Sequence, residues 1–352
     1  MISTPPLTRQ RSAISWQREL AQAVSDPAEL CRLLELDPQL LAGSEAARAQ
    51  FHLRVPRGFV RRMRRGDAAD PLLRQVLPLA AECAEIEGFV GDPLDEQAAM
   101  RAPGLLQKYH GRALLIATEA CAVHCRYCFR REFPYSDTHS GGPRWAAALE
   151  ALASDPSITE LILSGGDPLS LSNVRLAQLT DELRQIPHLR RLRLHTRTPI
   201  VLPERIDDAL LDWLASLPWP TAMVVHCNHA NEIDAPVREA MALVRARGVT
   251  LLNQSVLLAG VNDSTPALTT LSEELWAAGI LPYYLHLLDP VRGTAHFSVT
   301  ESHAVRLMRE LMSHLPGYLV PRLVRESPGA PSKTPVLVSG WDTLHSLSQR
   351  RC

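Results

Sequence analysis

The sequence predicts an α/β protein, built as an incomplete (β/α)6 barrel of the TIM type with a helical segment ahead of it. Two observations support this fold class. From residue 110 onward, short apolar runs alternate with longer amphipathic stretches, which is typical of parallel strands connected by helices. Polar residues gather directly after the apolar runs, at the strand ends where such barrels place their chemistry.

The composition is that of a globular protein. Of 352 residues, 46% are hydrophobic and 21% are charged, and the formal net charge is −1. This balance excludes a strong overall attraction to nucleic acid. The N-terminal stretch is polar, unlike a signal peptide, and no apolar run approaches the roughly 18 residues of a membrane span. We therefore expect a cytoplasmic protein that binds neither nucleic acid nor membranes and whose seven cysteines stay reduced.

The pattern divides the chain into three segments. Residues 1–105 are predicted to be mostly helical, with Ser25 as the N-cap of a helix in the stretch SDPAELCRLLEL. Residues 106–300 form the partial barrel, and residues 301–352 form a C-terminal segment. The stretch 54–66, RVPRGFVRRMRRG, is basic. A nucleic-acid patch and a solvated helix face both fit it, and the balanced total charge favours the solvated face.

Six apolar runs are the predicted strands of the barrel. They cover residues 112–118, 159–167, 189–198, 222–228, 249–258 and 282–288. Amphipathic helices are predicted between them, for example over 176–186 and over 235–248, where Gly248 suits a helix C-terminus. Parallel strands are joined by right-handed crossovers, and six of them predict an open barrel rather than the closed eight-stranded form.

The residues that follow these runs are expected to meet in one cavity. They are the cysteine stretch 121–128 and the polar stretches 164–167, 195–199, 226–229, 253–255 and 287–290. Because the carboxyl ends of parallel strands lie at the same end of a barrel, six such stretches in succession predict a single site.

Three cysteines in the stretch CAVHCRYCFRR, Cys121, Cys125 and Cys128, are the strongest functional signal. Structural zinc sites use four ligands, usually in two paired knuckles. His124 could complete a zinc set, but no second knuckle follows, so a non-catalytic zinc-binding module is the weaker interpretation. A 4Fe–4S cluster held by three cysteines leaves one iron open, and an open position marks a reactive site.

The pattern CxxxCxxC, with Tyr127 before the last cysteine, resembles the radical S-adenosylmethionine (SAM) superfamily. The resemblance implies that SAM binds the open iron, and that an electron from an external donor cleaves it through the cluster to a 5′-deoxyadenosyl radical. The stretch SGGD at 164–167 resembles the glycine motif of that superfamily, whose bare backbone approaches the SAM amino group. The predicted cofactor-binding residues of this part are Tyr127, Gly165, Gly166, Asp167 and His226.

Lysine is rare in this chain, because only Lys108 and Lys333 of its 37 Lys and Arg residues are lysines. A lysine amine, unlike a guanidinium, can deprotonate and attack a carbonyl. Lys333 lies in the Gly/Pro-rich stretch RESPGAPSKTPV, which resembles the segment that binds pyridoxal 5′-phosphate (PLP) in the lysine 2,3-aminomutase family. An ordinary surface lysine is the alternative. The resemblance implies a catalytic Schiff base at Lys333. It also implies phosphate contacts, in the stretches KYHGRALL and NQSVLLAGVND, from Lys108, Tyr109, Arg112 and Gln254.

The same resemblance implies a substrate-binding set. Arg130 matches the family's arginine that holds the substrate carboxylate with a bidentate fork. Asp289 and Glu326 match the two acids that hold the distal ammonium of lysine, although Glu326 stands where the family usually has aspartate. For Asp289 a helix-capping role is an alternative. Two acids at this end predict a substrate with a cationic terminus.

Within the family, the sequence resembles the short aminomutases that serve elongation factor P. The catabolic enzymes carry a C-terminal zinc-binding extension and a cysteine where this chain has Ser264, and this sequence ends at Cys352 without the extension. The resemblance implies an isomerase that converts (S)-α-lysine to (R)-β-lysine by 2,3-amino migration. A separate ligase then attaches the product to elongation factor P, and a homo-oligomer is compatible with the sequence. The alternatives are an aminomutase for another cationic amino acid and a radical SAM enzyme that works without PLP.

Overall fold

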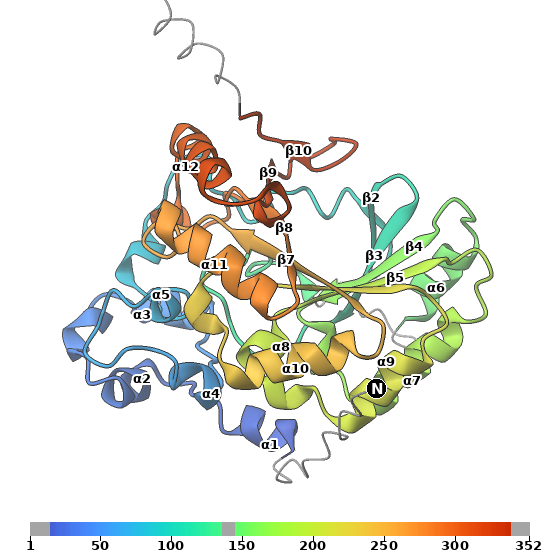
Figure 1. The fold of residues 1–352 in the computed structure, drawn as a ribbon, viewed down its shortest axis with the longest axis horizontal. Coiled ribbons are helices and arrows are strands. Elements are labelled where there is room, and N and C mark those ends of the chain that lie inside the picture. Colours follow the sequence, from blue (N-terminus) through green and yellow to red (C-terminus); the bar gives the residue numbers. More distant parts are fainter. Residues whose placement is uncertain (1–14, 136–144, 339–352) are drawn as a thin grey trace, which may run out of the picture.

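The computed structural model describes residues 15–135 and 145–338. Within these ranges the strands form one sheet, in which each strand pairs with its neighbours in the sequence (Figure 1). The outer ends of the predicted N-terminal and C-terminal segments, including Cys352, lie outside the described residues. No helix in the described part of the chain is long and apolar enough to span a lipid bilayer.

The six predicted strands are confirmed, and they pair in parallel in the predicted order. They are β3 (Arg112–Thr118), β4 (Glu160–Gly165), β5 (Arg191–Thr196), β6 (Thr221–Val225), β7 (Thr250–Val256) and β8 (Leu281–His286). The sheet extends further than predicted, because β9 (Arg322–Arg325) pairs in parallel with β8. Three antiparallel strands complete its edges: β1 (Met100–Ala102), β2 (Leu105–Tyr109) and β10 (Thr334–Pro335).

Each strand from β3 to β8 is followed by a helix that returns the chain to the start of the next strand (Figure 1). These helices are α6 (Ala146–Ala153), α7 (Asn173–Leu183), α9 (Asp208–Ser216), α10 (Ala235–Arg245), α11 (Thr265–Ala277) and α12 (Glu301–His314), with the short α8 (Thr198–Val201) directly after β5. In the main core, Leu176, Leu210 and Met241 of the helices pack with Leu161 and Met223 of the strands. This packing buries the outer face of the sheet.

Alternate residues of the strands line a cavity on the inner face, as the period of two along a strand requires. Arg193 and His195 of β5 line it, and so do Tyr284 and His286 of β8. Leu194, between the two residues of β5, belongs to the main core. Thr196, the last residue of β5, and Tyr283 of β8 reach the cavity wall as well. In a closed barrel the inward positions are filled by branched apolar side chains. Here many are charged or aromatic, so the interior of the open sheet forms a site.

The N-terminal segment is helical only in short pieces. Its helices are α1 (Trp16–Ala21), α2 (Pro27–Leu33), α3 (Glu45–Gln50), α4 (Arg57–Val60) and α5 (Pro71–Arg74), with the 3-10 turns η1 (Pro38–Leu41) and η2 (Ala80–Cys83). The prediction of Ser25 as the N-cap of α2 is wrong. Pro27 is the first helical residue, so the N-cap is Asp26, whose carboxylate accepts from the Ala28 amide.

A second core joins this segment to the cysteine stretch. Phe59 and Leu72 are fully buried, and they belong to the same cluster as Ala122 and Val123, two residues inside that stretch. The N-terminal segment therefore supports the cysteine loop from outside the barrel.

Four of the six arginines of the basic stretch 54–66 pair with acidic side chains, namely Arg57, Arg62, Arg64 and Arg65. Arg57 and Arg65 contact carboxylates at exposed or half-buried positions. Arg62 is buried instead, and it contacts Asp234. The stretch is thus largely neutralised by its own protein, which favours the solvated-face interpretation at the exposed positions and adds one buried anchor.

A buried ion pair ties the cysteine loop to the N-terminal segment. The Glu82 carboxylate, in η2, accepts from Arg126 and Arg131, and all three side chains are at most 2% exposed. Arg126 also donates to the carbonyls of Ala47 and Phe51. One carboxylate therefore balances two guanidinium groups away from solvent.

Replacing Glu82 by Gln should lower the free energy of unfolding by about 3 kcal/mol, because both buried guanidinium groups lose their anionic partner. The measurement is urea denaturation of the full chain followed by circular dichroism. Glu301→Gln is the matched control, since it breaks an exposed pair with Arg325 and should cost less than about 1 kcal/mol. Equal, small shifts for both variants would contradict the anchoring role of Glu82.

Candidate active site

A cavity of about 970 Å³ lies on the inner face of the sheet. Every site residue predicted from the sequence lines this cavity. They are Lys108, Tyr109, Arg112, Cys121, Cys125, Tyr127, Cys128, Arg130, Gly165, Gly166, Asp167, His226, Gln254, Asp289, Glu326 and Lys333. The barrel therefore brings together residues that are far apart in the sequence. The strand-end argument predicts this for the polar stretches after the strands, and the family resemblance predicts it for Lys108, Glu326 and Lys333. The individual roles of all these residues stay predictions.

The three cysteines lie in the loop after β3, with the Cys128 amide donating to the Cys125 carbonyl at 3.0 Å. Among the residues that the structure describes, no three His, Cys, Asp or Glu side chains are arranged to hold a single metal ion. In a 4Fe–4S cluster each cysteine binds a different iron, so the thiols need not converge on one point. His124, the alternative zinc ligand, stacks on Phe51 and contacts the His52 carbonyl through Nδ1.

The chemistry of this loop fits a cationic metal cluster. Burial raises the pKa of the Cys121 thiol and raises that of Cys128 to about 11. Near neutral pH both thiols stay protonated unless positive charge stabilises the thiolates. Iron would supply that charge.

Gly165 and Gly166 are required for a close approach of two backbone segments. A Cβ on Gly165 would lie 2.5 Å from the Thr118 carbonyl oxygen, and one on Gly166 would lie 2.5 Å from that of Ala120. Gly165 also has φ +117, which side chains rarely adopt. The space that side chains at these two positions would need is occupied by the main chain at the start of the cysteine loop. A contact of this backbone with SAM stays a prediction.

Asp167 fastens the end of β4 to the end of β5. Its carboxylate accepts from the Thr196 hydroxyl at 2.7 Å and from the main-chain amides of Arg197 and Thr198 at 2.7 and 2.9 Å. It also accepts from the Leu169 amide at 3.0 Å. The structure thus gives this carboxylate a scaffold function, and a direct cofactor contact by Asp167 stays a prediction.

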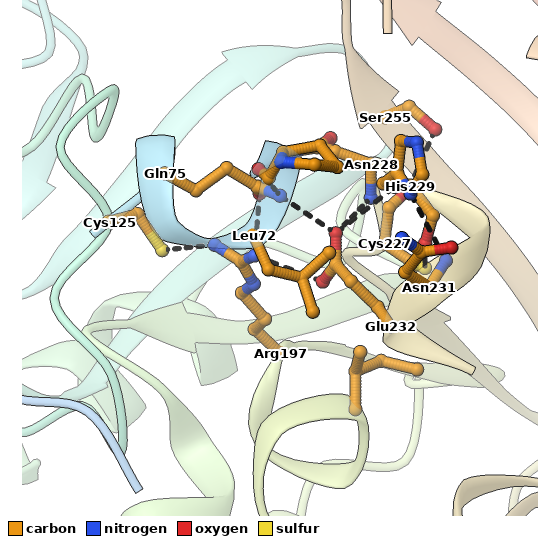
Figure 2. A network of polar contacts seen from close by, with 12 residues as sticks. Leu72, Gln75, Cys125, Arg197, Cys227, Asn228, His229, Asn231, Glu232 and Ser255 are labelled. Carbon is orange, nitrogen blue, oxygen red and sulfur yellow. Dashed lines mark hydrogen bonds and ion pairs between the residues drawn. The ribbon is translucent and has the colours of Figure 1, made fainter. Parts of the chain in front are cut away.

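Arg197 is the centre of a buried polar network beneath the cysteine loop (Figure 2). The guanidinium donates to Cys125 Sγ and to the Tyr127 hydroxyl on one side, and to Gln75 and Glu232 on the other. Tyr127, which the cysteine motif singled out, is thereby positioned by the residue that directly follows β5.

Five charged side chains of alternating sign form a chain across the cavity, here called the charge chain. Arg130 contacts Glu96 at 2.6 Å, Glu96 contacts Lys108 at 3.1 Å, Lys108 contacts Glu326 at 3.2 Å, and Glu326 contacts Lys333 at 2.5 Å. Each side chain is at most 19% exposed. Both lysines of the sequence therefore share the carboxylate of Glu326.

One edge of the Arg130 fork is taken by a carboxylate of the protein. Nε and Nη2 of Arg130 donate to the two oxygens of Glu96 at 2.6 and 2.8 Å. Nη1 makes longer contacts, to the Ser164 hydroxyl at 3.2 Å and to the Gly165 carbonyl at 3.3 Å. The edge that carries Nη1 is therefore the weakly bonded part of the guanidinium.

The two acids predicted to hold the substrate ammonium differ in pKa. Burial opposes ionisation of Glu326, but Lys333 and Lys108 outweigh it and lower the pKa of Glu326 to about 2. Burial, together with the Glu326 charge, raises the pKa of Asp289 to about 7. The capping alternative for Asp289 is wrong, since the next helical turn, η7 (Ala295–Phe297), begins after Thr294.

The residues predicted to hold the phosphate belong to two parts of the cavity wall. The Arg112 guanidinium stacks on the Tyr109 ring at 4.6 Å from its centroid. Gln254 contacts Nε2 of His226 at 2.9 Å. Burial lowers the pKa of His226 to about 3, so this imidazole is neutral and can accept from the Gln254 amide.

Sequence reasoning assigns no role to several residues of the site, although His195 belongs to the stretch 195–199 that is predicted to reach the cavity. Glu96 lies in an irregular stretch without any motif. His195 and His286 carry a weaker signal, because each is a polar residue at an inward position of a strand. Nε2 of both histidines is buried without a partner in the described part of the chain, and burial holds both pKa values well below the usual range. Neutral imidazoles of this kind fit polar atoms of a bound cofactor.

Lys333 fits the attachment of a carbonyl cofactor. It lines the cavity, with its ammonium 5.9 Å from the Tyr284 ring centroid, and it is 19% exposed, so it is not an ordinary surface lysine. Together with the partnerless imidazoles and the cationic side chains of Lys108 and Arg112, it forms a surrounding that suits PLP.

Comparison with known proteins gives the family. Residues 110–193 match a family model described as a 4Fe-4S single cluster domain. The chain is 51% identical to L-lysine 2,3-aminomutase of Escherichia coli over 91% of this chain and 94% of that protein. It is 46% identical to L-lysine 2,3-aminomutase of Haemophilus influenzae, over 94% and 97% of the two chains. It is 32% identical to L-lysine 2,3-aminomutase of Clostridium subterminale, over 92% and 77%.

Among solved structures, a radical SAM methyltransferase from Sphaerobacter thermophilus aligns with 63% of this chain and 68% of its own. Its TM-score of 0.40 and identity of 18% are too low to carry an argument. The similarity to the L-lysine 2,3-aminomutases does carry one, because at 51% and 46% identity it covers 94% and 97% of the proteins from Escherichia coli and Haemophilus influenzae. The chain belongs to the lysine 2,3-aminomutase family of radical SAM enzymes, and it is an isomerase whose cofactors are a 4Fe–4S cluster, SAM and PLP.

Proposed function

We propose that this chain converts (S)-α-lysine to (R)-β-lysine in the cytoplasm, and that the product is used by a ligase to modify elongation factor P. One observation carries the proposal: a guanidinium, Arg130, and two carboxylates, Asp289 and Glu326, line the same cavity as the Lys333 amine. Lysine has a carboxylate at one end and an ammonium at the other, and these protein groups complement both.

The protein's residues bind and orient the reacting groups. Lys333 provides the amine that attaches PLP, and Lys108 and Arg112 provide positive charge for its phosphate. Cys121, Cys125 and Cys128 provide the iron ligands. When bound, the cluster and SAM supply the radical chemistry, and PLP supplies a conjugated system that can delocalise an unpaired electron. The chain's own contribution to the rate is positioning and exclusion of side reactions.

The substrate carboxylate is proposed to bind at the Nη1 edge of Arg130. Glu96 fixes the other edge, so the guanidinium plane is set before the substrate arrives. Because arginine can bind one carboxylate on each edge, Glu96 orients the fork and need not leave.

The role in elongation factor P modification rests on the resemblance of residues 103–135, PGLLQKYHGRALLIATEACAVHCRYCFRREFPY, to the aminomutases of that pathway. The free α-carboxylate that Arg130 would bind argues for free lysine as the substrate, and the ligase would then act after this enzyme.

Anaerobic assay of the reconstituted protein with SAM, PLP and dithionite should convert L-lysine to β-lysine, as followed by chiral chromatography. L-ornithine and L-arginine test the alternative of another cationic substrate and should react more slowly. L-glutamate should not react, because it would bring a second carboxylate to Asp289 and Glu326. In cells that lack their own aminomutase but contain the ligase, production of this protein should let the ligase attach β-lysine to elongation factor P. Mass spectrometry should then show the corresponding increase in the mass of elongation factor P. Turnover of another amino acid faster than lysine would overturn the substrate assignment.

Borohydride reduction of the PLP-loaded protein should fix the cofactor on the peptide that contains Lys333. Lys333→Ala should abolish the imine absorbance band. Lys108→Ala is the matched control, since it removes the only other lysine and should weaken PLP binding while the imine band remains. An imine band that survives in Lys333→Ala and disappears in Lys108→Ala would exchange the roles of the two lysines.

The affinity for lysine should rise with pH through about 7. A cationic ammonium binds the ionised form of Asp289, whose pKa is about 7 because of burial and the nearby Glu326 carboxylate. Between pH 6 and pH 8 the ionised fraction rises about tenfold, and kcat/KM for lysine should follow it. The same profile for Asp289→Asn should be lower and flat over this interval. A wild-type profile without this rise would show that Asp289 does not titrate against the substrate.

A further inference from the structure

Arg197 reaches one of the three cysteines directly. It follows β5, and its Nη1 donates to Cys125 Sγ at 2.7 Å and to the Tyr127 hydroxyl at 2.6 Å. The side chain is 7% exposed. A charged group that is buried against a thiol needs an explanation, since the loss of hydration must be offset by its contacts.

The opposite side of the guanidinium is held by a network (Figure 2). Nη2 of Arg197 donates to Gln75 Oε1 at 2.7 Å and to Glu232 Oε2 at 3.0 Å. Glu232 also accepts from the Gln75 amide and from the main-chain amides of Asn228 and His229. The Asn228 side chain donates to Gln75. Because every partner of Arg197 on this side is fixed by another hydrogen bond, the guanidinium has little freedom to turn away from the sulfur.

A hydrogen bond to a cluster sulfur affects the energy of electron transfer. One-electron reduction by the external donor adds negative charge to the cluster and its thiolates. A positively charged donor at a thiolate stabilises that added charge, and hydrogen bonds to the sulfurs are among the factors that set cluster potentials. The Glu232 carboxylate balances the charge of Arg197, but the guanidinium N–H group still donates a hydrogen bond to Cys125 Sγ.

We propose that Arg197 is a positioning residue for the cluster, which holds Cys125 and Tyr127 in place and raises the reduction potential of the cluster bound by the three cysteines. The inference rests on the proposed binding of the cluster by Cys121, Cys125 and Cys128. It goes beyond the reaction assigned above, because it concerns the entry of the electron and makes no use of lysine or PLP.

The first test measures the midpoint potential of the reconstituted cluster in full-length protein, without SAM, PLP or lysine, by dye-mediated titration with electron paramagnetic resonance. Arg197→Gln should shift the potential to a more negative value than in the wild type. Arg197→Lys keeps the charge but cannot bond Cys125 and both network acceptors at once, so its potential should lie between the two. Arg62→Gln is the matched control. It removes another buried guanidinium, which donates to the Ile200 and Glu232 carbonyls and, within the described residues, to none of the three cysteines of the motif, so it should leave the potential near the wild-type value.

The second test uses the unaltered sequence, so it does not depend on the folding of a variant. The protein is labelled with arginine that carries ¹⁵N in the guanidinium, and the reduced cluster is examined by hyperfine sublevel correlation spectroscopy. A ¹⁵N coupling is expected in the wild-type sequence. The labelled Arg197→Lys protein serves only to assign it, because the coupling should be weaker there.

Iron and sulfide analysis of the wild type tests the cluster itself and separates the two proposals. A wild type that binds about four irons but shows no ¹⁵N coupling overturns the role of Arg197 alone. An Arg197→Gln protein with full iron content and an unchanged potential overturns it as well. A protein that binds no iron after reconstitution removes the basis of both the inference and the proposed function.

Discussion

The site depends on a close main-chain contact that only glycine permits. At Gly165 and Gly166 the end of β4 lies so near the carbonyls of residues 118–120 that a single methyl group would separate them. This contact fixes the start of the cysteine loop against the sheet. Asp167, the next residue, then ties the same point to the end of β5 through three donors of residues 196–198. These contacts place Arg197 next to Cys125. The close approach at the two glycines therefore determines the geometry of the Arg197 network, although neither glycine is part of that network.

The barrel could be predicted because its parallel strands and helices produce a recognisable alternation of short apolar runs and amphipathic stretches in the sequence. Each predicted run is apolar over a length suited to a buried strand. Because the strand ends of a parallel sheet must meet, residues as distant as Cys121 and Asp289 could be assigned to one cavity. Lys108 and Lys333 could be assigned to it only through the resemblance to the lysine 2,3-aminomutase family. The apolar pattern of the N-terminal segment is a weaker signal. Its helices are only four to seven residues long, too short for an apolar periodicity to repeat, and their buried residues share one core with Ala122 and Val123 of the cysteine loop. Glu96 could not be predicted as a site residue, because it is a single acid in an irregular stretch. Its place in the site follows only from its contacts with Arg130 and Lys108, which the sequence does not show.

Two ion pairs within the charge chain are of the same kind as the contacts proposed for the substrate. Glu96 meets Arg130 as a substrate carboxylate would, and the Lys333 ammonium meets Glu326 as the distal ammonium of lysine would. Attachment of PLP to Lys333 would use up this ammonium and so release the Glu326 carboxylate for the substrate. Loading of the cofactor and recognition of the substrate would then be coupled through one acid. The alternating signs also keep every buried charge beside an opposite one, which limits the cost of burying five of them.

The placement of the two lysines has a practical consequence for the chemistry of the whole molecule. Both line the cavity, and every other basic side chain of this sequence is arginine or histidine. The outer surface therefore offers acylating and crosslinking reagents no side-chain primary amine. Reagents that label most proteins indiscriminately would act here, apart from the terminal amine, as probes directed to the interior of the barrel. For the same reason, conventional coupling through surface amines would leave this protein unattached or attach it at its chain end.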